Sequence, residues 1–269
     1  LGEKLDQALI ERAEQLSIPK AEDEIAGMIL NRFAQIALVD KYEAYQIFKT
    51  EYEQITGDLE LIQTEGMNAV RQVDPNMVVK IPMTVEGLKG HIIPFEFAQK
   101  IFLKADMDEV DAKKARLQEI PSEYENLLEE CSEEEKEIIS EALNDSNDAF
   151  VIKNVKAMIK VLKQDAEENK TMIERLSKVE NLNSEEKKLK SEIKSAEEEL
   201  HLKTKTVIEN MTDKDIHHVL IVKWVDPICD GISKLPENLL GVLEKKVKAL
   251  SEKYADTYED IENEIAKTQ

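Results

Sequence analysis

The sequence predicts a mainly α-helical fold, with long antiparallel helices of the coiled-coil type and one small β-hairpin. Charged residues make up 35% of the 269 residues, and only 8 glycines and 7 prolines interrupt the chain, a balance that favours long helices. Apolar residues recur at helical spacing through most of the chain, whereas the β-branched, apolar sequence is concentrated between residues 67 and 94. Hydrophobic residues make up 42%, which is enough to build a sizeable core.

Residues 1–66 are expected to form a first helical block. Apolar residues lie on one stripe through residues 1–16, so a helix is predicted there, and Pro19 is expected to end it. A third helix should begin near Asp40, and Gly57 is the residue at which an interruption is expected. The block is therefore predicted to contain three helices.

Residues 67–94 are expected to form a β-hairpin insertion. Asp74 and Pro75 have the composition of a turn, and residues 77–83 are apolar and β-branched, as in a strand. Residues 87–90 contain two glycines and are expected to turn the chain into a second strand at residues 91–93.

Residues 95–164 are expected to form a second helical block. One helix should run to Cys131, with Pro121 as the expected point of a kink or division. Ser132 is followed by glutamate three residues later, the pattern of a capping box, so a new helix should begin there. A turn is predicted at residues 144–148, before a last helix of this block.

Residues 165–269 are expected to form a long helical arm with a C-terminal helix. A narrow apolar seam with steps of four and three residues, typical of a coiled coil, is made by Leu189, Ile193, Ala196, Leu200 and Val207. A second seam is made by Leu243, Val247, Leu250, Tyr254 and Ile261. Two pairings are open at this point: the seams pack on each other within the chain, or they pack on another protein.

The formal net charge of −21 makes an acidic surface, which repels nucleic acids and anionic membranes unless basic residues are locally concentrated. The lysines mostly stand beside glutamates, as in residues 185–188, and no concentrated basic patch is identified.

Cys131 and Cys229 lack a metal-type spacing and fit a reduced, cytoplasmic compartment. Neither a membrane span nor a secretory signal is recognised, and the first residue, Leu1, suggests a piece of a longer protein.

No catalytic, cofactor-binding or metal-binding residue is predicted in this chain. A phosphate-binding glycine loop and a serine nucleophile elbow are missing. His217 and His218 point about 100° apart on a helix, so ordinary surface residues are favoured over a weak metal site. Trp224 is expected to be a structural anchor. A hydrolase that uses the glutamate pairs is the least favoured alternative, because nothing apolar surrounds them to raise a pKa.

Seven stretches, in order along nearly the whole chain, carry a family resemblance. They are residues 38–46 (LVDKYEAYQ), 57–66 (GDLELIQTEG), 71–80 (RQVDPNMVVK), 90–96 (GHIIPFE), 200–205 (LHLKTK), 223–227 (KWVDP) and 249–255 (ALSEKYA). Their sequence and order resemble the C-terminal part of the modification (methyltransferase, M) subunit of type I DNA restriction-modification systems.

The resemblance implies an adenine-specific DNA methyltransferase as the parent subunit, in which a catalytic domain binds S-adenosylmethionine and methylates adenine N6. The cofactor motif and the Asn-Pro-Pro-aromatic motif of that domain do not occur here and would lie upstream, so this chain is expected to bind no cofactor. It would be the helical assembly region that docks the catalytic domain onto the DNA-specificity subunit. The implied partners are that subunit, a second modification subunit and the motor-nuclease subunit, with DNA reached through the complex and no membrane involved.

A stand-alone acidic coiled-coil scaffold or adaptor without an enzymatic parent is the alternative. It accounts equally well for the acidity and for the seams, but not for the hairpin or for the ordered stretches. The reading frame upstream of Leu1 discriminates between the two, because an Asn-Pro-Pro-aromatic motif there would establish the methyltransferase parent.

Overall fold

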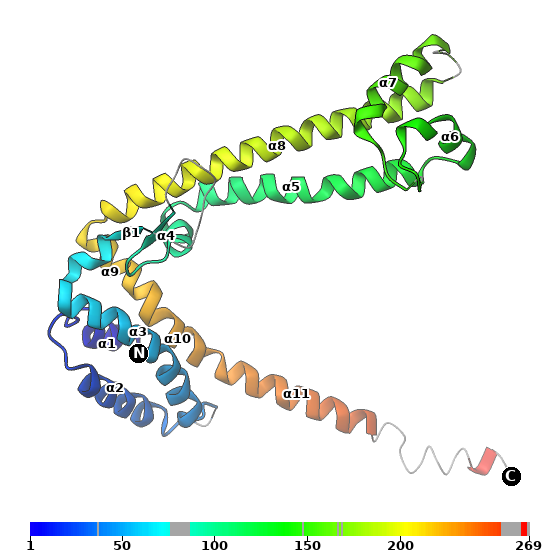
Figure 1. Ribbon diagram of the computed structural model, residues 1–269. Helices are drawn as coiled ribbons and strands as arrows, with labels where there is room; N and C mark the ends of the chain where they lie inside the picture. Colours follow the sequence, from blue (N-terminus) through cyan, green and yellow to red (C-terminus); the bar gives the residue numbers. More distant parts are fainter. Residues whose placement is uncertain are drawn as a thin grey trace. The chain divides into compact units, whose positions relative to one another are not determined.

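The computed structural model describes residues 1–36, 38–75, 87–146, 148–165, 167, 169–253 and 265–267. These residues form long helices and one small two-stranded antiparallel sheet, which confirms the predicted mainly α fold with one hairpin (Figure 1). The chain divides into two compact units, and neither is continuous in sequence. Unit 1 consists of Leu1–Asp74, Gly90–Ile93 and Ile208–Gln269, and unit 2 consists of Pro75–Lys89 and Pro94–Val207.

Unit 1 is built around helix α3, which packs against α2 and α10. Fully buried side chains of α3, such as Phe48 and Leu59, form its inner face. The hydroxyl of Tyr52 donates a hydrogen bond of 2.8 Å to the carbonyl of Ile18, which ties α3 to the start of α2. The helices of this unit are α1 (Gly2–Leu9), α2 (Ile18–Phe33), α3 (Lys41–Glu65), α9 (Asp213–Leu220), α10 (Asp226–Ser233) and α11 (Leu235–Lys253), with a 3-10 helix at Met67–Arg71 and a π-helical turn at Ile221–Val225.

The first helices differ from their predicted limits. Helix α1 ends at Leu9 rather than near residue 16, although Ile10 and Ala13 are still buried in the turns that follow. Pro19 does not end a helix but lies in the first turn of α2, where its missing N–H costs no hydrogen bond. Gly57 lies inside α3 without interrupting it, and α3 begins after Asp40, whose carboxylate accepts from the Tyr42 N–H at 2.7 Å.

The sheet pairs β1 (Val73–Pro75) with β2 (Leu88–Gly90). The hairpin therefore exists, but the predicted limits were wrong where they can be compared. Asp74 and Pro75, expected in a turn, lie in β1, and the expected turn at residues 87–90 contains β2. Residues 91–93 are not a strand, and residues 77–83 lie outside the described residues. The chain bends sharply after β2, and the bend requires glycine at position 90, because a Cβ atom there would lie 1.7 Å from the carbonyl oxygen of Ile93.

The two longest helices of unit 2, α5 and α8, lie side by side (Figure 1). The expected single helix from residue 95 to Cys131 is divided at Leu103, not at Pro121, which lies inside α5. The capping box at Ser132 is confirmed, since Ser132 and Glu135 bond each other's backbone N–H groups. The helices are α4 (Phe95–Phe102), α5 (Lys104–Glu129), α6 (Glu133–Ile138), α7 (Ile152–Leu162) and α8 (Lys170–Glu209), with 3-10 helices at Ser140–Ala142 and Lys163–Asp165.

Candidate interaction site

Helices α5 and α8 form an antiparallel pair held by ion pairs along its length. Near the start of α5, Asp106 binds Lys203 of α8 at 2.6 Å. Further along α5, Lys114 binds Glu197 of α8 at 2.7 Å. Residue numbers rise along α5 while they fall along α8, so the helices run in opposite directions. Such exposed pairs contribute little energy individually, but together they specify which faces of the two helices meet.

Arg116 is the centre of the most connected ion-pair group in this helix pair. Its guanidinium binds Glu185 of α8 at 2.7 Å and also Glu119 and Glu123 of its own helix. The hydrogen bond to Glu185 is the largest of several effects that raise the pKa of Arg116, and the same bond lowers the pKa of Glu185. Both groups therefore stay ionised, and the fork geometry of arginine suits a carboxylate on a neighbouring helix.

The first predicted seam lies partly against α5. Ile193 and Leu200 are buried, whereas Leu189, Ala196 and Val207 are half-buried. After Leu200 the buried position is Thr204, whose hydroxyl donates to the Leu200 carbonyl and accepts from the Gln99 amide of α4 at 3.0 Å. The side of α5 within this pair contributes buried Val110 and Ile120. Helix α8 therefore has a partner within its own unit, and it is α5 rather than the second seam.

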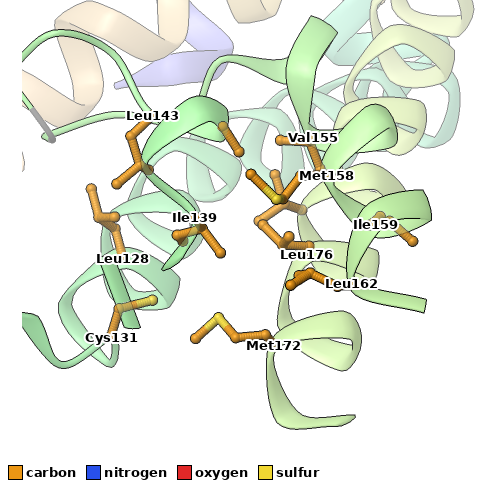
Figure 2. Packing of buried hydrophobic residues seen from close by; sticks show 12 residues of the cluster. Leu128, Cys131, Ile139, Leu143, Val155, Met158, Ile159, Leu162, Met172 and Leu176 are labelled. Atoms are coloured by element: carbon orange, nitrogen blue, oxygen red, sulfur yellow. The ribbon is translucent and has the colours of Figure 1, made fainter. Parts of the chain in front are cut away.

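A compact hydrophobic cluster closes the helix pair where α5 ends and α8 begins (Figure 2). Side chains from α5, from residues 131–143, from α7 and from α8 meet in it, so four stretches of sequence share one core. We call it the end cluster; its members are Leu128, Cys131, Ile139, Ala142, Leu143, Val155, Met158, Ile159, Leu162, Met172, Leu176 and Val179. Because these residues are buried by one another, the turn between α5 and α8 is a packed structure rather than a simple loop.

The second predicted seam is exposed where the structure describes it. The side chains of Leu243, Val247 and Leu250 on α11 are 47%, 63% and 54% exposed. Tyr254 and Ile261, the remaining members of this seam, lie outside the described residues. Further large apolar side chains on α11 are exposed as well, namely Leu239, Leu240 and Val242. Contiguous apolar residues that stay accessible to water are typical of a surface that binds another protein.

Trp224 lies in the core of unit 1 and is 1% exposed. Its indole N–H donates a hydrogen bond of 2.9 Å to the carboxylate of Asp58 on α3. The same carboxylate oxygen accepts from the ammonium group of Lys223 at 2.6 Å, and Lys223 also donates to the carbonyl of Ile92. We call these four residues the Asp58 network. It joins three segments that lie far apart in sequence, and every donor in it has an acceptor, as buried polar groups require.

The two adjacent histidines do not converge on a metal site. His217 lies 2.9 Å from the carboxylate of Asp6, and Asp215 is engaged in the capping box of Thr212. Among the residues that the structure describes, no group of three or more His, Cys, Asp or Glu side chains is arranged to hold a metal ion. Helix capping is therefore the role that the geometry assigns to Asp215.

The glutamate-rich faces were the only candidates for acid–base chemistry. A hollow of about 350 Å³ between α5 and α8 is lined by several carboxylates, including Asp106, Glu109 and Glu199. Lys203 binds both Asp106 and Glu199, and Lys113 binds Glu109 at 2.8 Å. All three of these carboxylates are therefore held in ion pairs with lysines of the same two helices.

Both cysteines are poor nucleophiles in this fold. Cys131 is buried in the end cluster, and burial raises the pKa of its thiol. Burial also raises the pKa of Cys229, which is half-buried. Because the thiolate is the reactive form, a raised pKa disfavours a catalytic role for either residue at neutral pH.

Within the described part of the chain, none of the helices combines the length and the apolar composition that crossing a bilayer requires.

One feature of the surface was missed by the sequence analysis. Helix α7 and the residue after it carry Lys153, Lys156, Lys160 and Lys163, all of them exposed. The signal that could have revealed them is their spacing of three, four and three residues in a stretch without acidic residues. The expectation that the chain contains no concentrated basic patch was therefore wrong for this helix.

No protein-family model matches the chain, and no significant similarity was found to a curated protein or to a solved structure. The resemblance to type I modification subunits therefore rests on the sequence stretches alone.

Proposed function

We propose that this chain is the C-terminal helical assembly region of a type I restriction-modification DNA methyltransferase subunit. In this role it docks an adenine-N6 methylating domain, which lies outside this chain, onto the DNA-specificity subunit. The exposed apolar face of α11 is the observation that carries the docking part of the proposal. Leu243, Val247 and Leu250 on this face follow the step of a coiled coil and are 47–63% exposed.

The positions of the resembling stretches in the fold support a common origin of this chain and type I modification subunits. Asp58, Ile92 and the pair Lys223–Trp224 belong to three of these stretches, and they form the Asp58 network in unit 1. All residues of a buried polar network must be present if each polar group in the core is to have a hydrogen-bond partner. The shared stretches are thus explained as fold-determining residues of the assembly region, and no catalytic role is assigned to them.

The docking proposal is tested by calorimetric titration of the full chain with purified specificity subunit. In the apolar-face variant, Leu243, Val247 and Leu250 are all changed to Ser. Burial of each aliphatic side chain is worth about 1.5–3 kcal/mol, so we expect the affinity to fall at least ~100-fold. The matched control changes Lys245, Lys248 and Glu252 to Ser on the opposite side of α11 and should bind almost normally.

Circular dichroism and Trp224 fluorescence of both variants check that the fold is intact. Absence of binding between the unaltered chain and the specificity subunit would refute the docking role. Equal losses of affinity in the two variants would show that the apolar face of α11 is not the docking surface.

The parent activity has two tests of its own. The reading frame upstream of Leu1 should encode an Asn-Pro-Pro-aromatic motif, which supplies the stacking ring and the acceptor for a flipped adenine. The chain alone should bind no S-adenosylmethionine in a calorimetric titration at micromolar concentration. If the upstream motif is missing and no partner subunit binds, the alternative of a stand-alone acidic coiled-coil scaffold is the better account, because the exposed α11 face would then serve a different partner.

A further inference from the structure

Helix α7 carries a stripe of positive charge on an otherwise acidic protein. The stripe consists of Lys153, Lys156, Lys160 and Lys163, and no Asp or Glu occurs between residues 152 and 163. At a rise of 1.5 Å per residue, the ten steps from Lys153 to Lys163 cover about 15 Å of helix. Their spacing places all four side chains on one face. The local charge is therefore +4, in a chain whose net charge is −21.

The opposite face of α7 is fixed in the end cluster. Val155, Met158, Ile159 and Leu162 point into this cluster and are 1–7% exposed (Figure 2). The packing holds the helix in one orientation, so the lysine stripe is presented to solvent by a rigid element. It also keeps the apolar face of α7 from entering a lipid bilayer, as a membrane-surface helix would have to do.

Most of the stripe is not neutralised by neighbouring acids. Lys156 lies 3.2 Å from a carboxylate oxygen of Glu180 on α8. Among the described residues, Lys153, Lys160 and Lys163 form no ion pair. Three ammonium groups on one helix face repel one another, and binding of a polyanion would relieve this repulsion.

We propose that the α7 stripe binds the phosphate backbone of duplex DNA. A duplex carries about one negative charge per 1.7 Å of its axis, so a row of cations about 15 Å long can contact several phosphates at once. The exposed face of α7 carries no aromatic side chain that could stack on unpaired bases or anchor a protein interface, which favours duplex backbone over single strands and over an acidic protein. Binding would therefore be independent of DNA sequence.

This inference does not depend on docking to the specificity subunit. It assigns to the chain a direct contact with DNA, whereas the proposed function reaches DNA only through the complex. The test uses the chain alone, so the two ideas can fail separately.

The number of contacts sets the expected salt dependence. For four phosphate contacts, the logarithm of the association constant should fall with the logarithm of salt concentration with a slope of about −3.6. Raising the salt from ~50 to ~200 mM should then weaken binding about 150-fold. A variant that keeps only one contact should retain a slope of about −0.9.

The experiment measures fluorescence anisotropy of a labelled 20-base-pair duplex of arbitrary sequence, titrated with the full chain at several salt concentrations. The stripe variant is Lys153→Gln/Lys160→Gln/Lys163→Gln. The matched control is Lys178→Gln/Lys187→Gln/Lys194→Gln, which removes three exposed lysines from α8. Both variants change the formal net charge from −21 to −24, so a difference between them reports position and not total charge.

We expect the stripe variant to lose at least ~10-fold in affinity at low salt and to show the smaller slope, while the control stays within about twofold of the unaltered chain. Undetectable duplex binding of the unaltered chain at ~50 mM salt would overturn the inference. Equal losses in the two variants would overturn it as well. Stronger binding to vesicles of anionic phospholipid, or to single-stranded DNA, than to the duplex would assign the stripe to a different polyanion.

Discussion

Leu176 gives the sharpest test of the end cluster. This residue of α8 is completely buried and belongs to the same cluster as Met158 and Leu162 of α7 (Figure 2). The substitution Leu176→Ala removes three carbon atoms, which at about 0.8 kcal/mol each gives about 2.4 kcal/mol of lost burial. The cavity left behind adds to this value, so the expected loss of stability is about 3 kcal/mol.

Hydrogen exchange of the backbone amides in α7 and in the first turns of α8 measures this loss locally. Amides that exchange through opening of the end cluster should exchange about 150-fold faster, because each 1.4 kcal/mol corresponds to a factor of ten. The control is Leu202→Ala in the same helix, where the side chain is 49% exposed and the expected change is below about 0.5 kcal/mol. Equal acceleration of exchange by the two substitutions would show that burial of Leu176 does not stabilise the end cluster.

Two further predictions concern polar groups of unit 1. Asp58→Ala leaves the ammonium group of Lys223 and the buried indole N–H of Trp224 without their acceptor, so unfolding in urea, followed by the fluorescence of Trp224, should show a loss of about 2–4 kcal/mol. The Asp74 carboxylate, 2.7 Å from Nδ1 of His91, raises the pKa of His91 in the folded state. The stabilising effect of protonated His91 should be complete below about pH 6.5 and be lost as the pH rises through the raised pKa. His91→Gln should therefore reduce the melting temperature at pH 5.5 more than at pH 9.

Each of these predictions has a control within the same unit. Asp23 on α2 is exposed, and Asp23→Ala should change the stability by less than about 0.5 kcal/mol. If Asp58→Ala is equally harmless, the Asp58 network does not stabilise unit 1. His218 lies on α9, and its replacement by Gln serves as the comparison for the His91 variant. A melting temperature whose pH dependence is the same with and without His91 would contradict the second prediction.

Local sequence patterns predicted those features that depend on residues close together in the chain. The capping box at Ser132 needs only a hydroxyl and a carboxylate three residues apart, and the structure contains it. The same locality explains the errors at the hairpin. Ile92 and Ile93 have the composition of a strand, but they lie in the tight bend after Gly90, and their side chains are buried in the core of unit 1.

The prediction that Val207 continues the first seam failed for a different reason. Val207 is more hydrophobic than Thr204, and a repeat of four and three residues continues through it. Thr204 is nevertheless the buried residue, because a straight helix drifts against a seven-residue repeat and because Gln99 satisfies its hydroxyl. The partner that makes a buried threonine acceptable comes from 105 residues earlier in the chain, and no pattern within α8 specifies it.

By itself, the sequence determined that this chain is mainly helical, that it is strongly acidic and that it contains two apolar seams, because composition and periodicity are properties of neighbouring residues. Only the tertiary structure decided which seam is covered: Leu200 of α8 is buried, whereas Leu250 of α11 is exposed although its spacing is equally regular. It also decided that the lysines of α7 face solvent together, since the end cluster takes the opposite face of that helix. A periodic pattern shows that a helix has an apolar face; burial of that face depends on residues that are distant in the sequence.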